Sequence, residues 1–289
     1  MKVSERLLFW LQVSRPGLWF PTMWLYLLPA AGSQPWTSWP FWLGLAYVMF
    51  PLNFFLYGIN DMADRVFDQT NPRKGNFWFG ARGTVKQLRS LWLPMIVVQV
   101  AFIVLIVWAT GAKFLLLFAA FLVISLLYNH PRIHLSRRSP LELIVQCGYV
   151  LVVPMSIWIN DLTPLGWATY TYLILFSMQS HLMGEVMDYY PDRESGKITT
   201  CVRLGIGKTK MLIIGIVAFE TAMLIWIFRD LPFSLFMSSA LLWLLIDWGA
   251  IFRTKAYNWT QMRLFAIGSN ALAVITMAYI WYSGCLVVY

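Results

Sequence analysis

The stretch Gly58-Ile-Asn-Asp-Met-Ala-Asp-Arg-Val-Phe-Asp68 is the feature around which the rest of the chain is interpreted. It closes a long apolar run and places three carboxylates and one amide close together. A shorter version, Glu185-Val-Met-Asp-Tyr-Tyr-Pro-Asp192, follows much later. Seven of the 13 acidic residues of the chain lie in 60–68 and 185–194, so the two clusters call for a shared explanation.

The composition is that of a polytopic membrane protein. The 289 residues are 59% hydrophobic and only 12% charged, with a mean hydropathy of +0.63, whereas soluble domains are about 25% charged. Sixteen Trp and 20 Phe fit interfacial belts and a lipid-facing exterior. The three cysteines are an odd number without metal-ligand spacing, which argues against a disulfide framework. The charged residues and Pro16 near the start do not fit a signal peptide.

Apolar runs of about the length of a membrane span can be placed nine times. They are roughly 18–33, 40–58, 91–110, 114–129, 142–159, 166–184, 211–228, 234–252 and 264–284. Backbone in lipid must be helical, so we expect an all-α fold of about nine transmembrane helices. The acid clusters follow the second and sixth runs, and this interval predicts two four-helix units plus a ninth helix.

The distribution of basic residues predicts the orientation. If the amino terminus is cytoplasmic, 20 of the 22 Lys and Arg residues fall on the cytoplasmic side, and only Lys113 and Arg229 fall outside. This is the positive-inside bias, and it accounts for the net charge of +9 without nucleic acid. We therefore expect an integral protein of a bacterial inner (plasma) membrane, with both acid clusters facing the cytoplasm.

The first acid cluster has the spacing of a divalent-metal site. On a helix, Asn60, Asp64 and Asp68 lie at i, i+4 and i+8 on one face, with Asp61 beside them, about 6 Å apart along the axis. Like charges this close repel unless a cation bridges them. Oxygen ligands suit Mg²⁺, which commonly uses one or two carboxylates together with substrate phosphates.

The second cluster repeats this pattern. Asp188 and Asp192 are again four residues apart, with Glu185 one turn earlier. Pro191 lacks a backbone donor and is expected to end or kink the helix there. Either cluster alone could be a solvated acidic loop, but two at equivalent positions favour a pair of metal sites that hold a diphosphate.

The motifs resemble those of the UbiA-type intramembrane prenyltransferase superfamily. Residues 60–68 look like its NDxxDxxxD signature, and residues 188–192 look like its second, DxxxD signature. The resemblance covers the chain, so 1–289 would form one transmembrane prenyltransferase domain around a central cavity, with 59–90 and 185–210 as cytoplasmic cap loops. It implies Mg²⁺ ions that bind the diphosphate of an allylic isoprenoid. The implied metal ligands are Asn60, Asp64, Asp68, Asp188 and Asp192, with Asp61 in support, and the four aspartates other than Asp61 would be the catalytic carboxylates.

The resemblance also implies basic diphosphate-binding residues. Tyr128-Asn-His-Pro-Arg132 resembles the family's YxxxK element, with Arg in place of Lys; Arg still supplies charge and a fork of donors. Ionising an allylic C–O bond places negative charge on the diphosphate, which metals and basic groups stabilise. The candidates are Arg15, Arg65, Arg73, Lys74, Tyr128, Arg132 and Lys197. Each basic residue among them has an equally good interpretation as a lipid-headgroup contact.

Short stretches indicate the acceptor. Asp68-Gln-Thr-Asn-Pro-Arg-Lys-Gly75 looks like the branch that includes lycopene elongases, and 192–200 fits that branch and chlorophyll-synthase-like members. The expected acceptor is a hydrophobic lipid of carotenoid or chlorophyll type; the alternative is an aromatic quinone precursor.

A secondary transporter is the competing class of protein. The carboxylates of transporters tend to lie near the membrane midplane, whereas these two clusters follow the ends of apolar runs. A phosphatidyltransferase would need a Gly-rich Asp motif that is missing.

Four further polar residues need an explanation. Ser139-Pro-Leu-Glu142 has the pattern of a helix-capping box, which predicts a structural role for Glu142. Glu220 and Asp247 lie within apolar runs and are costly there unless paired or facing a cavity; for Asp247 structural pairing is favoured over contact with the acceptor. His181, one turn before Glu185, is either a proton acceptor or a partner of the site.

Overall fold

The computed structural model describes residues 2–65, 68, 71 and 73–289. Within this part of the chain all regular structure is helical, and the only β contact is an isolated bridge between Asn76 and Gly80. The α-helices are α1 (Val3–Val13), α2 (Phe20–Leu27), α3 (Trp39–Met49), α4 (Pro51–Ala63), α5 (Val85–Arg89), α6 (Trp92–Thr110), α7 (Phe114–Asn129), α8 (Leu141–Gln146), α9 (Val152–Asn160), α10 (Trp167–Glu194), α11 (Thr200–Leu204), α12 (Ile206–Met223), α13 (Leu231–Ile246) and α14 (Trp259–Ser283).

Six helical segments of the described chain are long and apolar enough to cross a membrane. They are Trp39–Ala63, Val85–Thr110, Leu141–Asn160, Ile206–Phe228, Leu231–Ile251 and Trp259–Ser283. The all-α prediction is confirmed, whereas the count of nine is not. The other three predicted runs are helical but differ in length or polarity: 18–33 contains α2, only eight residues long, and 114–129 is the 16-residue α7. The third, 166–184, continues into the polar end of α10.

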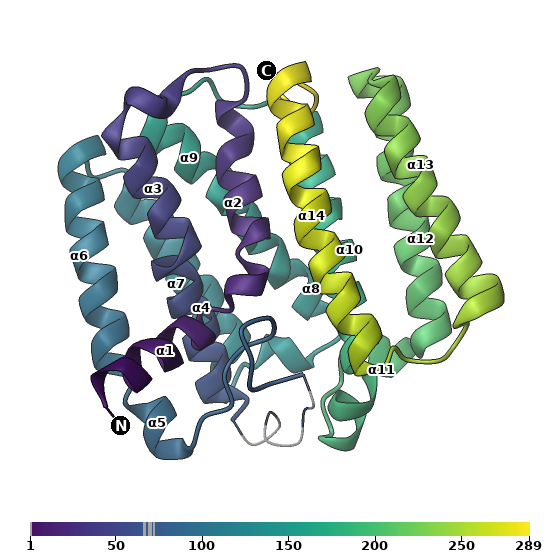
Figure 1. Cartoon of the computed structure of the whole chain (residues 1–289), viewed down its shortest axis with the longest axis horizontal. Coiled ribbons are helices and arrows are strands. Elements are labelled where there is room, and N and C mark those ends of the chain that lie inside the picture. The colour runs from purple at the N-terminus through teal and green to yellow at the C-terminus, as the bar shows by residue number, and fades with distance from the viewer. Residues whose placement is uncertain (1, 66–67, 69–70, 72) are drawn as a thin grey trace.

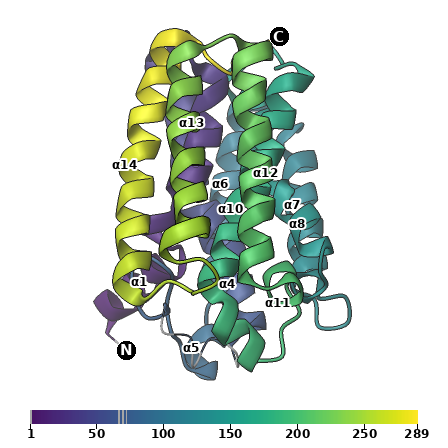
Figure 2. The same cartoon turned by 90° about the vertical axis from the view of Figure 1, so that its right-hand side faces the viewer.

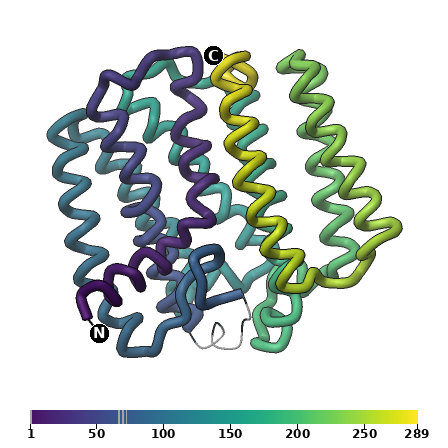
Figure 3. The backbone as a smooth tube through the Cα atoms, in the orientation of Figure 1, coloured from purple at the N-terminus to yellow at the C-terminus, as the bar shows by residue number. Residues whose placement is uncertain are grey.

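The long helices stand side by side, so the chain runs repeatedly between two ends of the molecule (Figures 1 and 3). The amino terminus, α1, α5 and α11 lie at one end, drawn at the bottom, and the carboxyl terminus lies at the other. Turned by 90°, the same arrangement holds, with α12, α13 and α14 upright beside each other (Figure 2). The grouping into two four-helix units around a central cavity stays a prediction.

The helix that carries the first acid cluster is interrupted at Phe50, between α3 and α4, and Pro51 begins α4. Buried side chains satisfy the backbone carbonyls near the break. Asn53 Nδ2 donates to the carbonyls of Val48 and Met49, each at 2.9 Å, and Gln99 Nε2 donates to that of Pro51 at 2.6 Å. Such compensation is what makes proline tolerable in a membrane helix, and it fixes the direction of α4 toward the site.

Two buried acids outside the motifs have structural partners. Asp247 forms an ion pair with Lys210 (2.7 Å) and accepts a hydrogen bond from Tyr257 (2.8 Å), so the predicted pairing is confirmed. Glu142 is structural through a different contact from the one predicted. No side chain caps α8, and Glu142 Oε1 instead accepts from the backbone N–H of Thr200 at 2.7 Å. The capping-box prediction was wrong because Glu142 lies against α11.

Candidate active site

The first acid cluster lies at the end of α4. Asn60 and Asp61 belong to its last turn, the helix ends at Ala63, and Asp64 is the C-cap residue. The backbone N–H of Asp68 still bonds to the carbonyl of Asp64 at 2.9 Å. The predicted single helix face therefore holds only up to Asp64, and Asp68 comes from the turn that follows.

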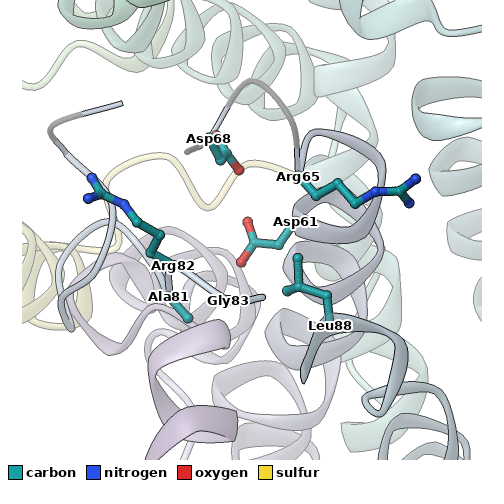
Figure 4. Close-up of a pocket in the computed structure, with 7 residues that line it drawn as sticks. All are labelled: Asp61, Arg65, Asp68, Ala81, Arg82, Gly83 and Leu88. Atoms are coloured by element: carbon teal, nitrogen blue, oxygen red, sulfur yellow. The ribbon is translucent and has the colours of Figure 1, made fainter. Parts of the chain in front are cut away.

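Asp61 is buried and doubly paired. Arg15 Nη2 and Lys74 Nζ each lie 2.6 Å from Asp61 Oδ1, and Lys74 also lies 2.9 Å from Asp68 Oδ2. Among the described residues the second oxygen of Asp61 has no hydrogen-bond donor. Figure 4 shows Asp61 and Asp68 facing the same small hollow, while the guanidinium of Arg65 points away from both.

Asp64 is held by cations from two other segments. Lys197 Nζ lies 2.9 Å from Oδ2, Arg137 Nη2 lies 3.1 Å from Oδ1, and His134 Nε2 lies 3.7 Å from Oδ1. Burial on its own would raise the pKa of Asp64, but the charge of Lys197 and the hydrogen bonds from Lys197 and Arg137 hold that pKa well below its usual range. Asp64 is therefore a carboxylate at neutral pH.

The second acid cluster lies on the last turns of α10, which continues past Pro191 to Glu194. Pro191 does not end the helix. Asp188 Oδ2 lies 2.6 Å from Arg73 Nη1, and its Oδ1 accepts from Asn71 Nδ2 at 3.2 Å. Asp192 Oδ1 lies 3.7 Å from Lys197 Nζ, so that single ammonium links the second cluster to Asp64 of the first.

Asp192 differs from Asp64 in its electrostatic surroundings. The pKa of Asp192 is raised to about 7. Burial is the largest cause, Lys197 lowers the pKa, and the nearby carboxylates Asp188, Asp64 and Glu185 raise it. A group of acids that repel one another in this way gains from a bound cation.

The structure brings most of the predicted basic residues to the acids. Arg15, Arg73, Lys74 and Lys197 each form at least one of the ion pairs above. Arg65 and Arg132 are exposed, and no ion pair to an acid is seen for either in the described chain. Tyr128 lies in the last turn of α7, near the charges of Lys197 and Asp64.

Three contributors were not predicted from the sequence. His134 and Arg137 come from the basic connector after α7, and Asn129 Oδ1 accepts from Asn60 Nδ2 at 3.2 Å. The connector's positive charge was visible in the sequence, but which of its cations meets Asp64 depends on how the chain turns. At His134 that turn adopts a left-handed conformation (φ 46°).

The acids do not form a metal cage by themselves. No group of three or more His, Cys, Asp or Glu side chains close enough to hold one ion occurs in the described residues. The donors nevertheless fit Mg²⁺, because they are oxygens, Asp61 keeps one orphan buried oxygen, and Mg²⁺ needs only one or two carboxylates when phosphates complete its shell.

Comparison with known proteins identifies the family. The UbiA prenyltransferase family model matches residues 18–271, which is most of the chain. The chain belongs to the UbiA prenyltransferase family. This UbiA-type enzyme is accordingly a prenyltransferase and an integral membrane protein, as its motifs and its apolar helices predicted.

Relatives of this UbiA-family enzyme include lycopene elongase/hydratases. One, from Corynebacterium glutamicum, is 26% identical over 210 residues, or 70% of this chain and 71% of the relative. Another, from Halobacterium salinarum, is 28% identical over 180 residues, 59% of this chain and 60% of the relative. The solved structure of a UbiA homolog from Archaeoglobus fulgidus bound to GPP and Mg²⁺ has a TM-score of 0.67 at 17% identity and covers 93% of this chain and 97% of that one. This likeness shows a shared fold.

Proposed function

We propose that this enzyme transfers an isoprenyl group from an allylic diphosphate to a hydrophobic acceptor, with Mg²⁺, at the end of the bundle where the acid clusters meet. The observation that carries the proposal is Lys197, whose ammonium lies between Asp64 and Asp192. Two motifs far apart in sequence thus share one cation. We infer that this end faces the cytoplasm, as the charge distribution predicts.

Each group of residues has a definite task in the proposal. The carboxylates of both clusters, with Asn60, hold the metal ions, which when bound would neutralise the charge that develops on the diphosphate. Arg15, Arg73, Lys74 and Lys197 are anchored on those carboxylates, so they are already oriented toward the diphosphate position. The apolar helices above the site would hold the prenyl chain and exclude water.

We further propose that the acceptor is a carotenoid-type polyene. The support comes from the stretch after the first motif that resembles the lycopene-elongase branch. Its Asn71 and Arg73 contact Asp188, and its Lys74 contacts Asp61 and Asp68. These residues therefore connect the two acid clusters, and the relatives named above are lycopene elongase/hydratases.

The test is transfer of label. Purified enzyme in lipid nanodiscs, with Mg²⁺, receives radiolabelled allylic diphosphates of different chain length together with lycopene, a chlorophyllide or an aromatic quinone precursor. We expect labelled lycopene; a labelled aromatic product alone would replace the acceptor proposed here. If no acceptor is labelled, and Na⁺ in place of Mg²⁺ stabilises the protein against heat while the allylic diphosphate does not, the transporter interpretation is correct instead.

A further inference from the structure

A polar stripe runs along α10 into the bundle from the second acid cluster. His181, Gly184, Asp188 and Asp192 are separated by three or four residues, so they lie on one face of the helix. His181 is two turns from Asp188, about 10 Å along the axis. It therefore lies beyond the carboxylates on the side where the carbon skeleton of a bound substrate would extend.

The same face borders open space at the level between His181 and Asp188. A Cβ built at Gly184 would meet no atom within 4 Å. The carbonyl of Gly184 accepts a hydrogen bond from Arg73 at 3.3 Å, and the same guanidinium pairs with Asp188. This part of α10 thus belongs to the site and is not filled by neighbouring side chains.

The imidazole of His181 is oriented by a carboxylate. Its Nε2 lies 3.3 Å from Oε1 of Glu185, one turn along the helix. Glu185 is buried, and its other oxygen accepts from the backbone N–H of Cys201 at 2.8 Å, which fixes the carboxylate in place. No hydrogen-bond donor is assigned to Oε1 within the described chain. A proton on Nε2 is attracted to that oxygen, which leaves the Nδ1 lone pair available to accept one.

We propose that His181 receives the proton that the acceptor must lose during prenyl transfer, with Glu185 as its positioning residue. The inference rests on the proposed function and adds the base that the proposed reaction needs. The allylic C–O bond breaks with its electron pair on the diphosphate, and a C=C pair of the acceptor bonds to the allylic carbon. The resulting cation loses a proton from an adjacent C–H to Nδ1 of His181, and the electrons of that bond restore a double bond.

The carboxylates are less well placed to take this proton. Asp64 and Asp188 are paired with cations at 2.9 and 2.6 Å, and Glu142 is bound by Thr200. Glu220 on α12 has no hydrogen-bond partner among the described residues, but it is 14 residues from the start of that helix, or about 21 Å from the site end. His181 is the base at the depth where the new C–C bond would form.

The experiment compares H181Q and H181N with H130Q, which changes an exposed histidine, in the nanodisc assay and with the acceptor that the wild type labels. Both glutamine and asparagine keep a polar side chain at position 181 but supply no base. We expect transfer to fall about 10²- to 10⁴-fold, the usual contribution of a general base, with an unchanged KM for the allylic diphosphate. Diphosphate should still be released, now with prenyl alcohol in place of the coupled product. E185Q should lose less, because His181 remains.

Transfer by both variants within about threefold of H130Q would overturn the assignment. So would a loss that comes with a raised KM and no change in the ratio of prenyl alcohol to coupled product, because that is the result of a purely structural role. Failure of the proposed function is a separate result: the wild type itself would label no acceptor.

Discussion

The two acid clusters use the same spacing in different surroundings. In the first, the side chains of Asp61 and Asp64 are 2% and 4% exposed, and several cations hold them. In the second, Asp188 and Asp192 are 27% and 12% exposed, and they lie on a helix that continues past them. The first cluster is thus part of the packing of the protein as well as of its candidate site, whereas the carboxylates of the second are more accessible to a ligand.

The largest effect should come from removing the metal, because it disables both clusters at once. Chelation of divalent ions should abolish prenyl transfer, and added Mg²⁺ should restore it, since the diphosphate would otherwise leave without charge neutralisation. The measurement is labelled product before and after EDTA, with excess Mg²⁺–EDTA as the control. Persistent transfer in EDTA would show that the basic residues alone are sufficient.

The next prediction separates the clusters. D64N and D188N should each lower transfer by about two orders of magnitude or more. Only D64N should also destabilise the fold, by about 3 kcal/mol, because the Asp64 carboxylate is 4% exposed and pairs with both Lys197 and Arg137, whereas Asp188 is 27% exposed. Thermal unfolding of both variants in detergent, without ligand, measures the difference. Equal loss of stability in the two variants would remove the contrast between the clusters.

A smaller effect is expected in the pH dependence of stability. The pKa of Asp64 is depressed in the folded state, so its contribution to stability is present above its unfolded pKa and is lost as the pH falls below about 4. K197Q removes a cation that depresses this pKa, so the folded-state pKa moves toward the unfolded one and less stability should be lost as the pH falls. Unfolding temperatures of the wild type and K197Q between about pH 3 and 6 provide the comparison, with K86Q as an exposed control. Parallel curves would contradict the role assigned to Lys197.

The sequence could predict the features that depend on neighbouring residues in the chain. Asn60, Asp64, Asp188 and Asp192 could be proposed as a site because a spacing of four residues along a helix defines their relative positions. The helical class and the membrane location followed from hydropathy, which is equally local. The predicted count of nine spans is not confirmed, since α2 is short and α10 ends in polar residues.

The partners of the acids depend on distant segments and could not be read from spacing. Lys197 meets Asp64 across 133 positions and Arg137 meets it across 73. The YxxxK-like stretch favoured Arg132, yet Arg137, five residues later, is the arginine that bonds to Asp64, after a left-handed residue at His134. The tertiary fold therefore determines which basic residue pairs with each acid.

The smallest effect distinguishes two arginines that the sequence treated as equal candidates. Arg15 bonds to Asp61 at 2.6 Å and stacks over Tyr57 at 4.2 Å, whereas Arg65 is exposed and its guanidinium points away from the acids (Figure 4). A hydrogen bond to a charged group contributes about 1.5–3 kcal/mol, so R15Q should lose roughly ten- to a hundredfold in kcat/KM. R65Q should stay within about threefold of the wild type.

Steady-state kinetics on both variants, with the allylic diphosphate varied, make this comparison. If R65Q loses as much as R15Q, the Arg65 side chain must turn toward the diphosphate when substrate binds. The first cluster would then close around its ligand and not be preformed. If R15Q alone is impaired, the pairing of Arg15 with Asp61 already sets the geometry of the diphosphate site before substrate arrives, which is the arrangement that its burial favours.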